Sequence, residues 1–259
     1  MSNIANDFDF LPNASELKAK LEQMQQSPEY QADRQWLQQE CQRLDAVAQR
    51  FGGQLSEIAQ AYEREVVRVE YATWGTIPRG FYCPSPVFDL VVGNTKRGKL
   101  CSRKPSRAKS WYEYGFDKEN RLLWCHEFFN GKPSYSEYLI YEENHVYGIK
   151  ADSERVSTVY DEIYENGRLT RLLHGMFLVD NRCRELNVET YEYDDSGITA
   201  YTWHNIMIPL NEIPAALAAI IPQTPFMRRN RYTFQKENGL ACSYSDGKYD
   251  YKITKARII

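Results

Sequence analysis

Residues 160–169 read Tyr-Asp-Glu-Ile-Tyr-Glu-Asn-Gly-Arg-Leu, and this stretch decides the fold. Its strand-forming residues run directly into Asn166-Gly167. Asparagine and glycine tolerate the positive φ that a tight hairpin turn requires. The stretch therefore predicts a β-strand, a tight turn and the start of a second, antiparallel strand.

Alternating aromatic and acidic residues extend this prediction along the chain. Tyr112-Glu-Tyr114, Tyr191-Glu-Tyr193 and Tyr249-Asp-Tyr251 each place two rings on one face of a strand and a carboxylate on the other. Seventeen of the 19 tyrosines lie at or after Tyr71, so the change in composition begins there. Alternation of this kind predicts half-buried antiparallel strands. The rings either fill a core between the sheet and the helices or form a binding surface.

Turn residues recur at nearly regular intervals, at 117–120, 142–144, 165–167, 194–197 and 236–239. Asn120, Asn144 and Asn166 are separated by 24 and 22 residues, which fits one hairpin per repeat. The sequence therefore predicts an α+β fold. In this fold N-terminal helices precede a large, curved, mostly antiparallel sheet of successive β-hairpins.

The N-terminal part of the chain has helical periodicity. Ser27-Pro28 suits the N-cap and first position of a helix, and Gly52-Gly53 ends it. Between them, apolar residues repeat at spacings of 7, 4, 3, 4 and 3, namely Tyr30, Leu37, Cys41, Leu44, Ala48 and Phe51. This stripe packs either on the rest of the chain or against a second copy or partner helix.

Two further helices flank this one. Asn13 and Glu16 form a capping box before a short apolar stripe, and Leu55, Ile58 and Tyr62 predict a helix after Gly53. We expect a helical segment over residues 1–67 and a β-hairpin repeat domain over residues 68–259.

Residues 205–227 interrupt the alternation. The apolar run Ala215–Ile221 follows Pro214 and is ended by Pro222. It predicts a short helix near 211–221 that plugs the concave face or the end of the sheet, because an exposed sheet edge invites aggregation.

Composition restricts the classes of function. A net charge of −3 disfavours attraction of nucleic acid by the whole surface, and 26% charged residues with 42% hydrophobic residues are typical of a globular protein. The N-terminus lacks the basic region and apolar core of a signal peptide, and no apolar stretch is long enough to span a bilayer. The six cysteines never occur as Cys-x-x-Cys. We therefore expect a cytoplasmic protein with free thiols and no membrane partner.

Linear motifs of catalysis or cofactor binding are absent from the sequence. The four histidines have no His-x-His or His-Glu-x-x-His spacing, and no phosphate-binding loop or nucleophile elbow occurs. We therefore predict no catalytic residue, no metal site and no cofactor. Three acidic pairs, Asp161/Glu162, Glu189/Glu192 and Asp194/Asp195, are either acid–base pairs or solvated strand faces.

One cluster of cations stands out as a candidate binding loop. Its members are Lys96, Arg97, Lys99, Arg103, Lys104, Arg107 and Lys109, with Trp111 and Tyr112 at its edge. A basic loop beside aromatic rings can bind phosphates, an acidic protein surface or stacked bases. The alternative is a solvated loop that offsets an acidic chain.

Two stretches carry a family resemblance. Residues 160–169 and Tyr191-Glu-Tyr-Asp-Asp-Ser-Gly197 resemble YD repeats of the Rhs type and the related MORN-variant repeats. The likeness covers residues 110–200 and 230–255, although the Gly-Arg-Leu element occurs only at 167–169. It implies consecutive β-hairpins in an extended or wrapped sheet. These families include shells of bacterial toxins and their antitoxin or immunity proteins.

Three hypotheses of function follow. The first is a non-catalytic protein-binding module, such as an immunity or antitoxin-like partner of a bacterial toxin, which comes from the resemblance. The second is a nucleic-acid or phospholigand binder that uses the basic loop 96–109. The third is an enzyme whose site lies between sheet and helices, which requires two or more side chains among His126, His174, His204 and nearby carboxylates to converge within hydrogen-bond reach in a pocket.

Overall fold

The computed structural model describes residue 23 and residues 25–92, 95–105, 108–152, 155–178, 181–208 and 226–259. Its helices are α2 (Pro28–Gly52), α3 (Leu55–Glu65), the 3-10 helix η2 (Gly80–Tyr82) and α4 (Phe88–Val91). Its strands are β1 (Arg68–Thr73), β2 (Leu100–Cys101), β3 (Ser110–Phe116), β4 (Leu122–Phe129), β5 (Lys132–Glu142), β6 (His145–Ala151), β7 (Val156–Glu165), β8 (Arg168–Phe177), β9 (Cys183–Asp194), β10 (Gly197–Met207), β11 (Phe226–Glu237), β12 (Leu240–Ser245) and β13 (Asp250–Arg257).

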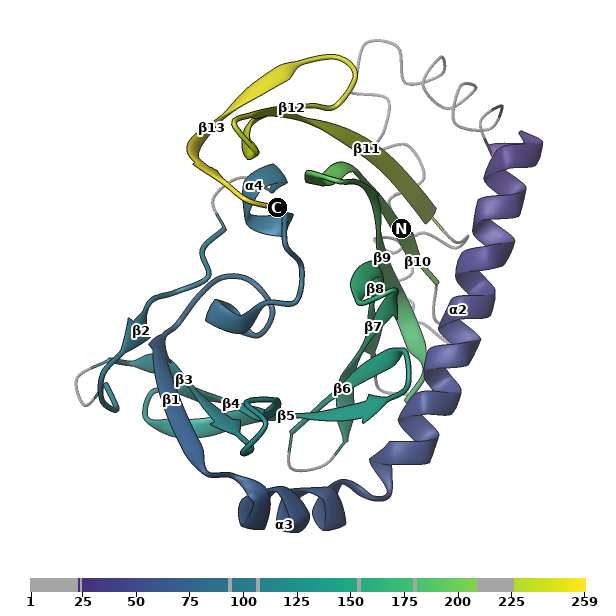
Figure 1. Cartoon of the computed structure of the whole chain (residues 1–259). Coiled ribbons are helices and arrows are strands. Elements are labelled where there is room, and N and C mark those ends of the chain that lie inside the picture. Colours follow the sequence, from purple (N-terminus) through teal and green to yellow (C-terminus); the bar gives the residue numbers. More distant parts are fainter. Residues whose placement is uncertain are drawn as a thin grey trace, which may run out of the picture.

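The strands form one antiparallel sheet of 13 strands in the order β13-β12-β11-β10-β9-β8-β7-β6-β5-β4-β3-β1-β2. From β4 onward every strand therefore pairs with its neighbours in sequence, whereas β3 pairs with β1 and β4. Figure 1 shows the strands arranged along an arc that leaves a convex and a concave side. Helices followed by successive antiparallel hairpins are the arrangement expected from the sequence.

The hairpin turns have the backbone conformation that their residues favour. Asn130-Gly131, Asn166-Gly167 and Asn238-Gly239 each connect two strands, and all six residues have positive φ. Both central residues of a type I′ turn need positive φ, which only asparagine, aspartate and glycine adopt at little cost. The predicted hairpin at 160–169 is thus confirmed as β7, its Asn-Gly turn and the first residues of β8.

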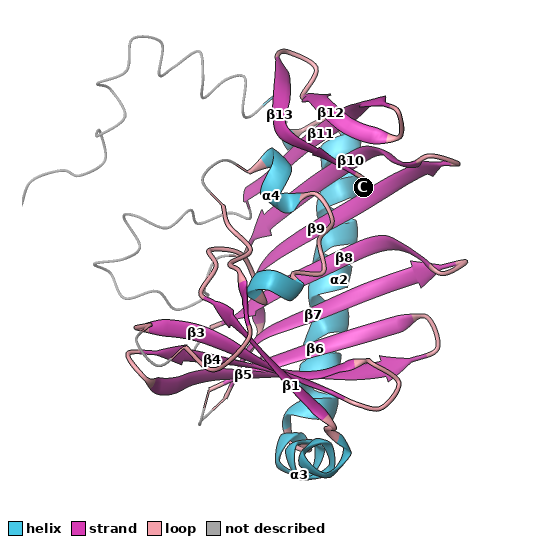
Figure 2. Ribbon diagram, turned by 60° about the vertical axis from the view of Figure 1, so that its left-hand side comes forward, coloured by secondary structure: helices cyan, strands magenta, loops and turns pink. Residues whose placement is uncertain are grey.

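Helix α2 begins and ends where its sequence predicts. The Ser27 hydroxyl accepts a hydrogen bond of 3.2 Å from the Tyr30 amide, Pro28 is the first helical residue, and Gly53 is the C-cap. All six residues of the predicted apolar stripe are buried, together with Val47. The helix runs across the strands on the convex side of the sheet (Figure 2).

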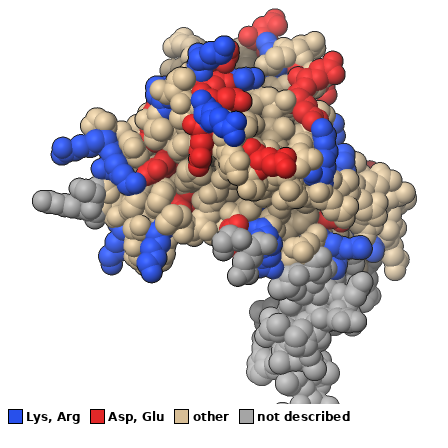
Figure 3. Space-filling model, turned by 90° about the horizontal axis from the view of Figure 1, so that it is seen from below, with Lys and Arg blue, Asp and Glu red and all other residues tan. Residues whose placement is uncertain are grey.

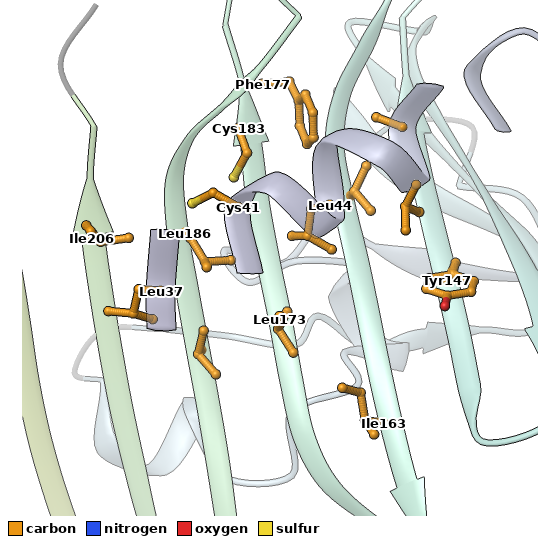
Figure 4. Packing of buried hydrophobic residues seen from close by; sticks show 14 of the residues in the cluster. Leu37, Cys41, Leu44, Tyr147, Ile163, Leu173, Phe177, Cys183, Leu186 and Ile206 are labelled. Atoms are coloured by element: carbon orange, nitrogen blue, oxygen red, sulfur yellow. The ribbon is translucent and has the colours of Figure 1, made fainter. Parts of the chain in front are cut away.

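The apolar stripe of α2 packs on the chain's own sheet. Leu37, Cys41 and Leu44 share a core with residues of the convex face that include Leu173 and Leu186 (Figure 4). Leu37, Leu44, Leu173 and Leu186 have no exposed surface. The intramolecular interpretation of the stripe is confirmed. Packing of this kind, rather than helix propensity, supplies most of the stability of a helix in a folded protein.

Residues 74–92 and 95–99 occupy the concave side. They are the described part of the connection between β1 and β2 and carry η2 and α4. Figure 1 shows this connection inside the arc of strands, opposite α2. Val87 is fully buried against the sheet, in one cluster with Tyr160, Tyr191 and Tyr201. We refer to residues 74–92 and 95–99 as the inner segment. No pattern in the sequence predicted that this connection covers the sheet.

Two predicted helices lie outside the described residues, the one after Asn13 and the one near 211–221. The third predicted helix is confirmed as α3, and β1 begins three residues after its end. Within the described part of the chain, no helix is long and apolar enough to cross a membrane.

Candidate functional site

Arg79 anchors the inner segment to the concave face. Its guanidinium lies 2.5 Å from Glu137 Oε1 on β5 and 2.7 Å from Glu162 Oε1 on β7, and only 3% of the Arg79 surface is exposed. Burial alone lowers the pKa of Arg79, but the two carboxylates hold it well above its ordinary value. The arginine therefore stays charged and links two strands to the segment that covers them.

The backbone at this anchor requires glycine at the next position. Arg79 and Gly80 both have positive φ. A Cβ atom on Gly80 would lie 2.5 Å from the ring of Tyr112, and the Tyr114 hydroxyl donates a hydrogen bond of 3.0 Å to the Arg79 carbonyl. The inner segment thus approaches the tyrosines of β3 more closely than any side chain at position 80 allows.

A second polar anchor is the buried carboxylate of Glu189 on β9. Its Oε2 accepts hydrogen bonds from the Ser85 hydroxyl at 2.5 Å and the Tyr191 hydroxyl at 2.6 Å. Burial raises the pKa of Glu189 to about 7, although these bonds, one from Tyr201 and the charge of Arg97 act against the increase. Glu189 therefore exchanges its proton near neutral pH.

Asp89 on α4 connects the inner segment to the last strand. Arg97 donates to its Oδ1 at 2.9 Å, while Arg257 of β13 donates to Oδ1 at 2.7 Å and to Oδ2 at 2.9 Å. Burial alone raises the pKa of Asp89, but these bonds lower it below its ordinary value. The carboxylate stays ionised and holds two arginines.

Between these anchors, the inner segment and the concave face enclose a cavity of about 570 Å³. We call it the concave cavity. Rings form much of its wall, namely Phe88, Tyr160, Tyr201, Trp203 and Tyr232. Aliphatic and sulfur-containing side chains complete it, namely Pro78, Cys83, Pro84, Val91, Val92, Leu172 and Met176. Its volume and mainly apolar wall are typical of a site for a small organic molecule.

A few polar groups from neighbouring strands converge on the concave cavity. They are Ser85, His174, Glu185, Asn187 and Glu189. His174 stacks on Tyr160 with their ring centroids 4.6 Å apart. Burial lowers the pKa of His174 to about 4, so its imidazole is neutral at pH 7.

Asn205 Nδ2 donates to Glu185 Oε1 at 3.1 Å and to Asn187 Oδ1 at 3.0 Å. Strand pairing fixes the positions of all these side chains except that of Ser85.

The residues of the predicted basic loop are divided between two places. Lys96, Arg97 and Lys99 belong to the inner segment, and the other described ones lie after β2. None of its described residues lines the concave cavity. Lys96, Lys99, Arg103, Lys104 and Lys109 are exposed, and Arg107 lies outside the described residues. Arg97 is half-buried and bonds Asp89 and the carbonyl oxygens of Cys83 and Ser85. The Lys104 ammonium lies 2.6 Å from a Glu113 oxygen.

The two aromatic residues predicted beside this loop are buried. Trp111 is 7% exposed and stacks on Phe128, and Tyr112 is 3% exposed and lies under Gly80. Figure 3 shows lysines and arginines interspersed with acidic residues on the face that carries α3. Binding of nucleic acid or phosphate by the exposed cations stays a prediction. The ligand would contact the lysines and arginines, because these two rings are buried.

The histidines of the enzyme hypothesis do not meet. His126 bonds Ser136 and stacks on Trp124, His204 contacts Trp36 of α2 on the convex side, and His174 lines the concave cavity. The acidic pairs are separated as well. Asp161 bonds Arg43 and His145 whereas Glu162 bonds Arg79, because adjacent strand residues point to opposite faces.

Glu189 and Glu192 are likewise on opposite faces. Glu189 faces the inner segment, whereas Glu192 is exposed and pairs with Arg231. Within the described ranges, no group of three or more His, Cys, Asp or Glu side chains is arranged to hold a metal ion.

The sequence did not predict which residues line the concave cavity. In particular, it did not predict that Ser85, His174 and Glu189 line the same cavity. Ser85 and Glu189 are 104 residues apart, so no local spacing connects them. One signal was present in the sequence. Glu189 stands two and four residues before Tyr191 and Tyr193 and therefore shares the face of those rings, which is unusual for a carboxylate on a buried face.

Comparisons with protein-family models, with curated proteins and with solved structures found no match for this chain.

Proposed function

We propose that this chain is a binding protein of the α+β class whose curved sheet holds a small organic molecule in the concave cavity. The observation that carries the proposal is the cavity itself, with aromatic walls and the buried carboxylate of Glu189. Sites for small molecules combine an apolar wall with a few polar groups that orient the ligand.

Both walls of the cavity are held in place by hydrogen bonds and ion pairs within the chain. Arg79 and Ser85 bond glutamates of three different strands from the inner segment, and Asp89 bonds Arg257 of β13. A preformed site loses little conformational entropy when it binds, which increases affinity.

The polar groups favour binding over catalysis. Within the described part of the chain, the Glu189 carboxylate accepts hydrogen bonds from the hydroxyls of Ser85, Tyr191 and Tyr201, and the neutral imidazole of His174 stacks on a tyrosine ring. General acid–base catalysis needs donor and acceptor groups within hydrogen-bond reach of the reacting atoms. Among the described residues, His174 and Glu189 are not hydrogen-bonded to each other, and each has another partner that fixes its orientation.

A fragment screen tests the proposal. Compounds of one or two rings are titrated into the full chain and followed by calorimetry, and each hit is repeated on Met176→Trp. Met176 lines the cavity and is 38% exposed, so a larger ring fills the cavity while the strand retains its fold. We expect at least one fragment to bind the wild-type chain and to lose binding in this variant.

The matched control is Leu240→Trp. Leu240 is 36% exposed on β12, does not line the cavity and should keep full binding after the substitution. Thermal unfolding verifies that both variants are folded. If no fragment binds the wild-type chain, or if hits bind Met176→Trp equally well, the proposal is wrong.

A partner protein is the second candidate, supported by exposed rings at the β12–β13 hairpin. Tyr249 is 66% exposed and Tyr251 38% exposed. Exposed tyrosines give large contact area at a small entropic cost. An immunity or antitoxin-like role predicts a 1:1 complex with a toxin encoded beside this chain, measured by co-elution in size-exclusion chromatography. Tyr249→Ser with Tyr251→Ser should weaken that complex, and a wild-type chain that never co-elutes with the toxin contradicts it.

A further inference from the structure

We infer that the concave cavity selects a ligand with an amine or ammonium cation beside an apolar body. The inference rests on the proposed binding function and names the chemical class of the ligand. It follows from the charge of the cavity wall, from its rings and from the absence of a competing cation among the described residues that form it.

The wall of the cavity is acidic. Glu185 and Glu189 both contribute to it, and the described residues that line it include no lysine or arginine. The nearby Arg97 is directed away, because it bonds Asp89 and the carbonyl oxygens of Cys83 and Ser85. An anionic ligand would meet two carboxyl groups, of which that of Glu189 is buried, whereas a cation would neutralise a charge that is costly to bury.

The rings of the wall favour a cation as well. Trp203 and Tyr232 are half-buried, and both line the cavity together with Phe88. The faces of aromatic rings attract cations, and pockets that combine several rings recognise alkylated ammonium groups. Tyr160 contributes less, because His174 stacks on it and the Arg79 guanidinium lies 5.6 Å from its ring centroid.

A neutral ligand such as a sugar would also contact rings and carboxylates. It would leave the charge of Glu185 and Glu189 without a counter-ion inside the cavity. The same wall therefore discriminates between ligands of equal shape and different charge, and this difference can be measured.

The experiment compares three probes of similar size by calorimetry at pH 8, namely 2-phenylethylammonium, 2-phenylethanol and 3-phenylpropionate. Cation–ring and charge-assisted contacts strengthen when water is excluded. We expect the cation to bind about tenfold more tightly than the alcohol, and the carboxylate not to bind.

Substitutions in the cavity wall test which residues cause the preference for a cation. Glu189→Gln and Trp203→Leu should each reduce the affinity for the cation about tenfold, and Glu189→Gln should reduce the affinity for the cation by a larger factor than the affinity for the alcohol. Glu165→Gln, at an exposed position at the end of β7, is the control and should bind as the wild-type chain does. Thermal unfolding shows whether each variant is folded.

The pH dependence gives an independent measurement. Ser85, Tyr191, Tyr201, Cys83 and Arg97 surround Glu189, and Arg97 stays charged while Cys83, with a pKa of about 12, stays protonated from pH 6 to pH 8. His174 stays neutral over this range. Binding of the cation should therefore strengthen from pH 6 to pH 8 with release of a proton, and Glu189→Gln should abolish this dependence.

The outcomes separate the two proposals. If the alcohol or the carboxylate binds as tightly as the cation, the inference of a cationic ligand is wrong although the binding function stands. A sugar or an anion found as a hit in the fragment screen would also show that the inference of a cationic ligand is wrong. If no probe and no fragment binds, the binding function itself fails.

Discussion

The Ser85 hydroxyl donates a hydrogen bond of 2.5 Å to the buried carboxylate of Glu189, 104 residues further along the chain. This bond joins the inner segment to the middle of the sheet. Because the carboxylate is only 7% exposed, its protonation is coupled to folding and to anything that enters the concave cavity.

Glu189 makes the stability of the chain depend on pH. Its pKa rises from 4.5 to about 7 on folding. The folded chain therefore binds more protons than the unfolded chain between these values, and the free energy of unfolding falls as pH rises through this interval, by about 3 kcal/mol. Urea unfolding of wild type and Glu189→Gln between pH 5 and pH 8 measures this. The variant should lose this part of the pH dependence; parallel curves for the two chains would contradict the prediction.

Arg79, Glu137 and Glu162 stabilise the fold only while the positive and negative charges are buried together. Arg79→Met leaves Glu137 and Glu162 buried without a cation, which costs about 3 to 5 kcal/mol of unfolding free energy. Replacing both glutamates by glutamine in the same chain removes the buried charges and should restore most of this loss. Urea unfolding at pH 7 tests both changes. An Arg79→Met chain as stable as wild type would show that the buried ion pairs do not hold the inner segment.

The contact between α2 and the sheet contributes a large part of the core. Leu44 has no exposed surface and packs among Leu173 and other residues of the convex face. Leu44→Ala should lower the free energy of unfolding by about 2 to 5 kcal/mol, because the cavity it leaves closes only in part. Gln39→Ala, at an exposed position of the same helix, should change it by less than about 0.5 kcal/mol. Equal effects of the two variants would argue against this packing.

Reactivity with a thiol reagent tests the placement of the cysteines. Cys41, Cys83, Cys125 and Cys183 are buried, whereas Cys101 and Cys242 are half-exposed. Burial raises the pKa of Cys83 to about 12, which suppresses its reactive thiolate further. Ellman's reagent should modify two thiols rapidly in the native chain and all six after unfolding in urea. Rapid modification of more than two native thiols would contradict the buried positions.

The sequence by itself determined the local structure of this protein. The Asn-Gly dipeptides fixed the hairpin turns because their residues adopt positive φ, and the alternation of Tyr191, Glu192 and Tyr193 fixed which side chains share a face. The spacing from Tyr30 to Phe51 predicted which side of α2 is buried. Each of these properties depends on residues that are close together along the chain.

Only the tertiary structure decided where the candidate site lies. Residues 74–99 carry no pattern that places them on the concave face. Their position depends on contacts of Arg79, Ser85 and Asp89 with residues 58 to 168 positions away. Trp111 and Tyr112, predicted beside a binding loop, are buried because Trp111 stacks on Phe128 of the paired strand β4 and Tyr112 lies against Gly80 of the inner segment. Sequence spacing records neighbours along the chain, whereas burial and cavities arise from residues that folding brings together.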